Sequence, residues 1–344
     1  MRVAIVHDDL VQWGGAERVL EGLCEIYPDS PIYTSVFDYS NNQLVSRFAN
    51  KKIITSFLQK IPGWKSFYKV MLPLYPIAFE QFNFDGFDLV ISHTTRFAKC
   101  IITKPQTRHI SYCHTPPRFL WHLSGEKNYG FLEILMSKLR IYDQVSAKRV
   151  DYFIAGSQNA QKRIKKIYKV NSKIVYPFVD LQRFEGVETF DGGYFVIIGR
   201  PAAYKRFDLI IEACKKIGVS LKIISGEFDE KQVVQILAGC KALIIAGVED
   251  FGLASLEAQA LGKPVIAYRD GGALETVIEG KTGLFFDHPT VDSLVKILRR
   301  FNDLSTSLEV GLNHWNKQEI KKNAQKFSKD LFLKNFQQTV VALL

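Results

Sequence analysis

Short apolar runs alternate with longer amphipathic stretches along this chain. Several apolar runs are continuous and rich in β-branched residues, as in strands that are buried on both faces of a sheet. The alternation predicts an α/β protein with parallel sheets and right-handed crossovers. We expect strands at Arg2–Val6, Asp88–Ser92, Ile110–Cys113, Tyr152–Ala155, Lys173–Tyr176, Tyr194–Ile198, Ser220–Ile224, Ala242–Ala246, Val265–Tyr268 and Leu284–Phe286, and helices at Ala16–Ile26, Ser157–Tyr168, Phe207–Lys216 and Ala254–Leu261.

The segment Pro177–Gly193 is rich in glycine, proline and aspartate, has weak periodicity, and precedes a fresh strand. We therefore expect an N-terminal domain over residues 1–178, a linker over 179–193 and a C-terminal domain over 194–319. A helix over 320–344 is expected to pack back toward the first domain. The cleft between two such domains is the expected place for a ligand.

Two basic residues follow the strand expected at Tyr194–Ile198. Arg200 and Lys205 lie in the segment that connects this strand to the next helix. Ligands of open α/β sheets bind beyond the carboxyl ends of the strands. Because a guanidinium forks onto phosphate oxygens and an ammonium acts as a point charge, this placement favours phosphate binding over an ordinary solvated loop.

An acidic loop and a glycine follow a later strand of the same half. The backbone amides of Phe251, Gly252 and Leu253 are expected at a helix N-terminus, where they form an anion site. Glu249 in the loop and Glu257 in the helix could reach one ligand from different sides. Carboxylates beside a phosphate site suit sugar hydroxyls, which donate hydrogen bonds to them. Taken alone, Glu257 would be an ordinary surface charge.

Glycines and histidines follow predicted strands of the N-terminal half. Gly14 and Gly15 precede a predicted helix, and such a pair lets the backbone approach a diphosphate, although alone it is a weak motif. His7, His93 and His114 each come directly after a strand, at the edge where a ligand would bind. For His7 and His93, a purely structural role as hydrogen-bonded histidines stays open.

Composition narrows the class of protein. The 344 residues are 47% hydrophobic and 23% charged, which excludes disorder as the dominant state. The net charge of +10 favours anionic partners, but no nucleic-acid-binding motif is present, so nucleic acid is not an expected partner. Five scattered cysteines indicate reduced thiols. Because no apolar run reaches roughly 18 residues and no signal peptide is evident, we expect a cytoplasmic protein.

Together these motifs resemble the retaining glycosyltransferases of family 4. That family has the GT-B fold, in which two Rossmann-like, doubly wound α/β domains face each other across a cleft. Two further segments, 55–60 and 111–121, resemble a mannosyltransferase subgroup that builds O-antigen, lipopolysaccharide and related surface polysaccharides. The resemblance spans nearly the whole chain and rests on Gly14–Arg18, Gly199-Arg200 with Lys205-Arg206, Glu249–Ala258, Gly262–Ala267 and Gly271–Glu275.

The resemblance implies a substrate and a reaction. A nucleotide-diphosphate sugar, with GDP-mannose favoured, would lie mostly on the C-terminal domain. Its sugar would pass to a glycan or lipid-linked acceptor with retention of the anomeric configuration. No metal and no other cofactor is implied.

The resemblance also assigns roles to residues. Glu249 would contact the sugar hydroxyls, and His114 would lie near the anomeric carbon, so these two are the catalytic candidates. Glu257 would hold the ribose. The diphosphate would be bound by Arg200, Lys205, the amides of residues 251–253, and Gly14 and Gly15 from the other domain.

One stretch departs from the family pattern. After Ser225-Gly226 the chain proceeds directly to the next helix, and roughly twenty residues of the family pattern are missing. In the family, that stretch helps to form the pocket for the nucleotide base. The identity of the base is therefore open, and a non-catalytic scaffold subunit of the same fold is an alternative. A nucleotide-sugar epimerase is a weaker one.

Basic and aromatic residues interleave between Lys51 and Phe84, with no acidic residue before Glu80. This pattern suits an anionic membrane surface, which would place the protein at the inner face of the cell membrane. An ordinary helix with its apolar face in the core is an equal alternative.

Overall fold

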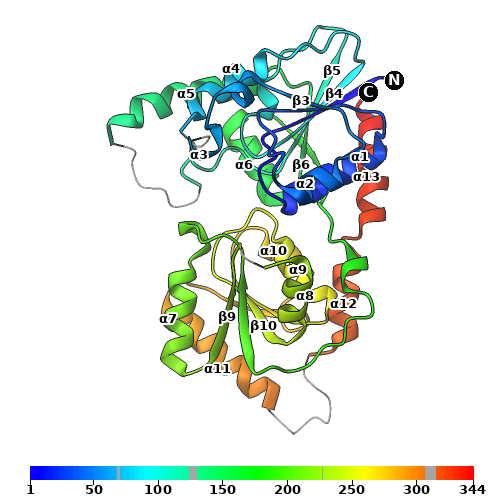
Figure 1. The fold of residues 1–344 in the computed structure, drawn as a ribbon. Coiled ribbons are helices and arrows are strands. Elements are labelled where there is room, and N and C mark those ends of the chain that lie inside the picture. The colour runs from blue at the N-terminus through cyan, green and yellow to red at the C-terminus, as the bar shows by residue number, and fades with distance from the viewer. Residues whose placement is uncertain (68–69, 124–129, 227, 307–314) are drawn as a thin grey trace. The chain divides into compact units, whose positions relative to one another are not determined.

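Among the described residues, seven parallel strands form the sheet of the first of two structural units (Figure 1). The computed structural model describes residues 1–67, 70–123, 130–226, 228–306 and 315–344. The first unit comprises Met1–Tyr176 and Phe332–Leu344, and the second comprises Pro177–Leu331. The strand order in the first sheet is β3-β2-β1-β4-β5-β6-β7, with β1 (Val3–His7), β2 (Ile32–Thr34), β3 (Ile53–Thr55), β4 (Leu89–Thr94), β5 (Arg108–Cys113), β6 (Tyr152–Ala155) and β7 (Ser172–Ile174).

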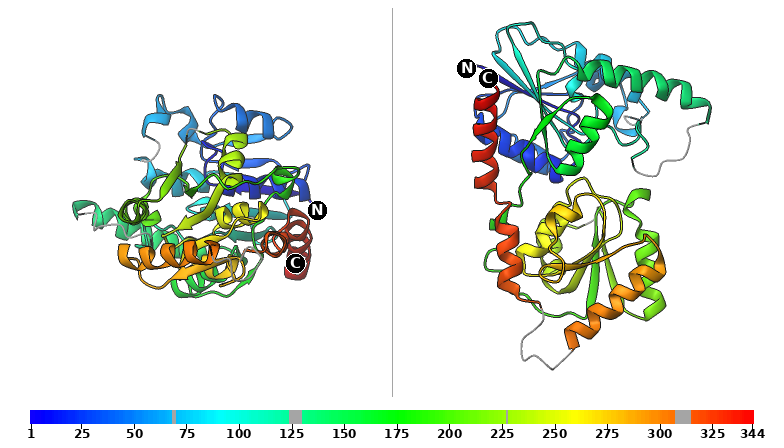
Figure 2. Two further views of the ribbon diagram at one scale, coloured as in Figure 1. Left: turned by 90° about the horizontal axis from the view of Figure 1, so that it is seen from below. Right: turned by 180° about the vertical axis from the view of Figure 1, so that it is seen from behind.

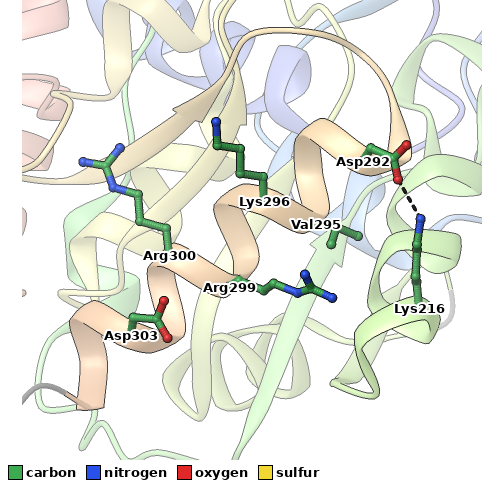
Figure 3. A pocket seen from close by; sticks show the side chains of 7 residues that line it. All are labelled: Lys216, Asp292, Val295, Lys296, Arg299, Arg300 and Asp303. Atoms are coloured by element: carbon green, nitrogen blue, oxygen red, sulfur yellow. Dashed lines mark hydrogen bonds and ion pairs between the residues drawn. The ribbon is translucent and has the colours of Figure 1, made fainter.

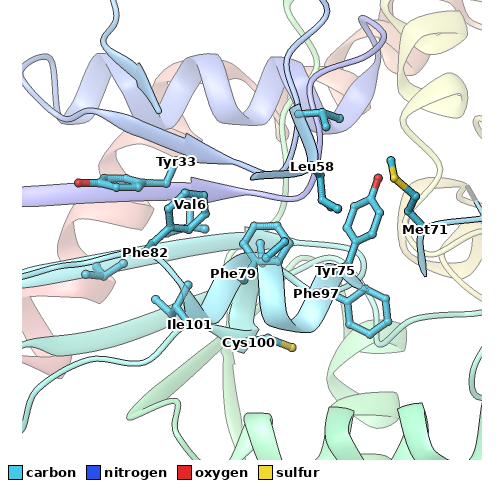
Figure 4. Packing of buried hydrophobic residues seen from close by; sticks show 14 of the residues in the cluster. Val6, Tyr33, Leu58, Met71, Tyr75, Phe79, Phe82, Phe97, Cys100 and Ile101 are labelled. Carbon is cyan, nitrogen blue, oxygen red and sulfur yellow. The ribbon is translucent and has the colours of Figure 1, made fainter. Parts of the chain in front are cut away.

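Helices connect these strands. Local sequence fixes several helix starts: the Asn41 side chain caps the second helix and the Ser157 side chain caps the sixth. An aromatic-rich core forms where Val6 and Tyr33 of the sheet pack with Tyr75 and Phe79 (Figure 4). The helices of this unit are α1 (Gly15–Ile26), α2 (Asn42–Arg47), α3 (Trp64–Phe67), α4 (Tyr75–Glu80), α5 (Glu133–Ala147), α6 (Gln158–Tyr168) and most of α13 (Lys329–Leu343).

The second unit contains a five-stranded parallel sheet of order β12-β11-β10-β8-β9. Its strands are β8 (Tyr194–Ile198), β9 (Ser220–Ile224), β10 (Cys240–Ile245), β11 (Val265–Tyr268) and β12 (Gly283–Phe286). The connecting and C-terminal helices are α7 (Phe207–Ile217), α8 (Glu230–Ala238), α9 (Leu253–Ala260), α10 (Ala273–Thr276), α11 (Val291–Thr306) and α12 (Lys317–Gln325). The predicted α/β class with two parallel sheets is therefore confirmed.

The C-terminal segment, expected as a single helix, is two helices. In α12, Asn323 Nδ2 donates to Gln259 Oε1 of α9 at 2.7 Å, so this helix belongs to the second unit. In α13, Phe332 and Phe336 lie against the ring of Tyr112, at centroid distances of 6.1 and 5.8 Å, and belong to the first unit. Figure 2 shows both helices in orange-red and red.

The shortened stretch lies at the edge of the second sheet. The chain goes from the edge strand β9 to α8 and then to β10, and the described residues of this stretch form no further strand, as the sequence predicts. Residue 227 of this stretch lies outside the described residues. Asp229 starts α8 with a reciprocal capping box to Gln232. The start of α8 is therefore fixed by its own capping residues.

No helix within the described ranges is long and apolar enough to cross a bilayer.

Candidate functional site

A basic turn follows the carboxyl end of β8. Gly199 has φ +130°, and a Cβ at this position would lie 2.6 Å from Lys205 Nζ. The positive φ favours glycine at this position, and the end of the Lys205 side chain passes close to its backbone. Arg200 is exposed, and no hydrogen bond or ion pair links its side chain to another described residue.

The Lys205 ammonium and the Glu249 carboxylate form an ion pair, with Nζ 2.9 Å from Oε1. The two residues are 44 positions apart and lie in the segments that follow β8 and β10, which are neighbouring strands. Gly247 explains the close approach, since a Cβ there would lie 2.1 Å from the Tyr204 carbonyl oxygen. The two strand-end loops are thus in backbone contact. Both side chains are about four-fifths buried (17% and 18% exposed), so the solvent screens this pair only partly.

The loop after Glu249 starts α9. Gly252 precedes the helix with φ +95°, and Leu253 is its first residue. The Phe251 side chain is buried against Phe327, at a centroid distance of 5.4 Å. Gly272 packs on the same backbone, because its Cβ would lie 2.3 Å from the Cα of Phe251. The helix start that carries the expected anion-binding amides is thus held by packing from two sides.

A second ion pair, which the sequence did not predict, holds Glu257. Arg183 Nη1 donates to Glu257 Oε1 at 2.8 Å, and both side chains are about nine-tenths buried. Arg183 lies in a short 3-10 helix, Leu181–Phe184, within the segment expected as a linker. The sequence pattern could not indicate this pair, because Arg183 lies in an expected linker and is 74 residues from Glu257. Glu257 is therefore a paired, buried carboxylate and not a surface charge.

In the first unit, Gly14 is the N-cap of α1, and Gly15 is the first helical residue. A Cβ on Gly14 would lie 3.1 Å from Glu17 Oε2, so glycine leaves room for this carboxylate. The Glu17 side chain turns inward: it is buried, and Oε1 lies 3.7 Å from His7 Nε2. The Gly-Gly turn and the histidines at the strand ends are thus neighbours.

The three histidines at the strand ends contact each other. His7 Nδ1 lies 2.9 Å from His93 Nδ1, and His93 Nε2 lies 2.6 Å from His114 Nε2. His93 is fully buried, and burial, together with the nearby His114 and His7, lowers its pKa well below 6.5. His93 is therefore neutral near pH 7. His7 and His93 are hydrogen-bonded within the protein, as the structural alternative for these two residues expects. The same contacts connect them to His114.

A shallow groove lies elsewhere, between α7 and α11 (Figure 3). Lys216 and Asp292 form an ion pair of 2.6 Å across it. No residue of the expected site lines it. Its lining residues are Lys216, Asp292, Val295, Lys296, Arg299, Arg300 and Asp303.

The structure thus groups the candidate residues within each unit. In the second unit it brings together Lys205, Glu249 and the start of α9, and holds Glu257 on Arg183. In the first unit it joins the Gly-Gly turn to His114 through Glu17, His7 and His93. Among the described residues, no three histidine, cysteine, aspartate or glutamate side chains are arranged to hold a metal ion.

Both halves of the chain match known glycosyltransferase families. Residues 13–183 match the family described as Glycosyltransferase Family 4, and residues 194–326 match the Glycosyl transferases group 1. The chain belongs to the family 4 glycosyltransferases, and its two Rossmann-like units have the GT-B fold.

Individual relatives are distant. An alpha-1,3/1,6-mannosyltransferase of Dictyostelium discoideum is 33% identical over 157 residues, which are 45% of this chain and 36% of that protein. An uncharacterized glycosyltransferase of Methanocaldococcus jannaschii is 23% identical over 334 residues, which are 87% of this chain and 88% of the relative. Among solved structures, Anabaena HepE in complex with UDP has a TM-score of 0.70 at 15% identity, covering 99% of this chain and 100% of its own.

Proposed function

We propose that this protein transfers mannose from GDP-mannose, with retention of configuration and without a metal, to a glycan or lipid-linked acceptor in surface-polysaccharide synthesis. The observation that carries the proposal is the ion pair of Lys205 and Glu249 beside the start of α9. This arrangement sets a cation and the amides of a helix start next to a carboxylate. A sugar diphosphate requires both, since its phosphates need charge stabilisation and its hydroxyls need acceptors.

Each residue of this group has a distinct role in the proposal. Negative charge grows on the diphosphate as the glycosidic bond breaks, so the Lys205 ammonium and the amides of residues 251–253 stabilise the transition state more than the ground state. Arg200, which is exposed in the turn after β8, adds a second cation when the donor binds. Glu249 accepts hydrogen bonds from the sugar hydroxyls. In the ligand-free arrangement, it keeps the Lys205 ammonium in position.

Glu257 contributes to binding of the nucleoside. Its Oε1 accepts from Arg183, and in the proposal the same carboxylate accepts hydrogen bonds from the ribose hydroxyls. Arg183 thus acts as a positioning residue that this proposal adds to the expected set. From the first unit, Gly14, Gly15 and His114 act on the diphosphate and the sugar of the same donor.

Product analysis tests the reaction. Purified protein is incubated with GDP-mannose and a lipid-linked glycan fraction, and the anomeric configuration of the transferred mannose is determined by NMR. We expect an α-mannoside. A β-mannoside, or no transfer and no GDP release with any nucleotide sugar of a broad panel, contradicts the proposal.

The short path from β9 through α8 to β10 favours a second candidate, a non-catalytic scaffold subunit. Replacing Glu249 by alanine separates the two. If the variant protein is folded and polysaccharide assembly stops in cells, the transferase is supported. If assembly continues, the scaffold is supported.

We further propose that the first unit docks on an anionic membrane, where a lipid-linked acceptor resides. Large apolar side chains are exposed at Val70, Leu74 and Ile77 around α4, and at Ile134 and Ile141 along α5. Lys65 at α3 is half exposed and pairs with Asp38. Vesicle sedimentation with and without anionic lipid tests this proposal. Double replacement Val70→Ser with Ile77→Ser should reduce binding, whereas unchanged binding contradicts it.

A further inference from the structure

Four side chains form one continuous chain from the start of α1 to the end of β5. Glu17 of α1 contacts His7 at the end of β1, with Oε1 3.7 Å from Nε2. His7 contacts His93 of β4 at 2.9 Å between Nδ1 atoms, and His93 contacts His114 at 2.6 Å between Nε2 atoms. Of these links, only the one to Glu17 ends on a carboxylate.

Strand register explains why these residues meet. His7 pairs with His93 across β1 and β4, and His93 pairs with Tyr112 across β4 and β5. Side chains that are paired in register lie on the same face of a parallel sheet, and His114 follows Tyr112 by two positions, so it shares that face. Glu17, His7 and His93 are all buried, at 4%, 3% and 0% exposure, so water does not replace these contacts.

Proton counting allows only two arrangements of this chain. A neutral imidazole has one N–H, so His93 donates either to His7 or to His114, and accepts from the other. Burial lowers the pKa of His93, which keeps its ring neutral. If the His7–His93 contact and the His93–His114 contact each hold one proton, the tautomer of any one histidine determines the tautomers of all three.

Glu17 selects between the two arrangements. An ionised carboxylate only accepts hydrogen bonds, so it favours a proton on His7 Nε2. His7 Nδ1 then accepts from His93 Nδ1–H, and His93 Nε2 accepts from His114 Nε2–H. In the other arrangement, the unprotonated Nε2 of His7 faces the Glu17 carboxylate, and two acceptors then lie against each other. Titratable groups near this chain include Asp8, whose charge acts on His7, and Tyr112, which stacks on His93.

We propose that Glu17 is a positioning residue, which acts through His7 and His93 to hold His114 in the tautomer with a protonated Nε2 and a bare Nδ1. On the proposed function, on which this step rests, His114 then accepts a hydrogen bond from a hydroxyl of the donor sugar and does not donate one. The glutamate of the Gly-Gly-Ala-Glu turn thereby has a role distinct from diphosphate binding.

Nitrogen NMR of ¹⁵N-histidine-labelled wild-type protein tests the proposal without any variant, because protonated and bare ring nitrogens give well-separated resonances. We expect protons on His7 Nε2, His93 Nδ1 and His114 Nε2, with resonances assigned from single histidine replacements. The opposite pattern, with a proton on His114 Nδ1, overturns the proposal. The readout needs no donor: an active enzyme with the opposite pattern overturns only this inference, and an inactive enzyme with the expected pattern overturns only the proposed function.

Variants of α1 test the role of Glu17 directly. In folded Glu17→Gln and Glu17→Leu proteins, we expect a mixture of both His114 tautomers, and a kcat at least tenfold lower with unchanged affinity for GDP. Glu21→Gln is the matched control, because Glu21 lies one turn further along α1 and pairs with Arg47 at the surface. A single, unchanged His114 tautomer in either Glu17 variant contradicts the proposal. If neither variant folds, the wild-type measurement decides alone.

Discussion

Lys205 Nζ and Glu249 Oε1 lie 2.9 Å apart at the carboxyl ends of two adjacent strands, although 44 residues separate them in the sequence. Two glycines make this possible. Gly199 leaves room for the lysine side chain, and Gly247 allows the two loop backbones to touch. The pair therefore depends on backbone geometry as well as on the two charges.

Replacement of Lys205 by methionine removes the cation and keeps most of the side-chain volume. We expect kcat for GDP release from GDP-mannose to fall about 100- to 1000-fold, the range observed when one preorganised charge-stabilising group is lost. Lys216→Met is the matched control, because Lys216 also forms an ion pair but lies in the α7–α11 groove. Equal kcat values for the two variants would exclude the proposed role of Lys205.

Gly247→Ala tests the backbone contact between the two loops. The added Cβ would overlap the Tyr204 carbonyl at 2.1 Å, and we expect a loss of about 1–3 kcal/mol in unfolding free energy together with reduced turnover. Gly280→Ala serves as the control: its Cβ meets no atom within 4 Å, and only its φ of +74° opposes the substitution, at a cost of about 1–2 kcal/mol. Urea unfolding and GDP release measure both effects. If Gly247→Ala left turnover unchanged, the loop contact would not position Lys205.

The buried pair of Arg183 and Glu257 gives a third prediction. Arg183→Leu leaves the Glu257 carboxylate without its partner, and we expect a loss of about 2–4 kcal/mol in unfolding free energy and a higher KM for the donor. In the double variant Arg183→Leu with Glu257→Leu, stability should largely return, because the buried Glu257 carboxylate is removed together with Arg183, while donor binding stays weak. If the double variant is as unstable as Arg183→Leu, the stability that Arg183 contributes does not come from its ion pair with Glu257.

Acidification should destabilise the protein through buried histidines of the first unit. Burial lowers the pKa of His109 to about 3 and that of His93 well below 6.5. The unfolded chain takes up protons on both near pH 6.5 and the folded chain does not, so this stability is present above pH 6.5 and is lost as the pH falls. Each histidine contributes up to about 1.4 kcal/mol per pH unit.

Urea unfolding at pH 7.5 and pH 5.5 measures this effect, and we expect lower stability at pH 5.5. His109→Gln keeps a hydrogen-bonding partner for Ser92 and should reduce the difference between the two pH values. An equal or higher stability at pH 5.5 would contradict the assignment of these histidines as neutral and buried.

Much of the fold could be predicted from the sequence because its central strands are continuous apolar runs. The strands β2 and β3 were missed, since each has only three residues and no clear pattern. The C-terminal segment was expected as one helix, because its break over residues 326–328 contains no glycine or proline.

Part of the site could be predicted because the strands themselves could be located in the sequence. Residues in the segment that follows a strand, such as Lys205 after β8 and His114 after β5, can be located by position alone. The contact of His7 with His93 depends on β1 and β4 being neighbours, and the pairing of Arg183 with Glu257 joins distant segments. Strand order and long-range pairs are properties of the folded chain that local patterns do not encode.

Whether Lys205 binds the diphosphate of a guanine nucleotide is tested most directly by calorimetry. GDP, UDP and ADP are titrated into the wild-type protein and into the Lys205→Met and Lys216→Met variants. We expect GDP to bind the wild type and Lys216→Met equally, to bind Lys205→Met at least tenfold more weakly, and to bind better than UDP and ADP. Binding of none of the three nucleotides, or equal GDP affinity in all three proteins, would contradict it.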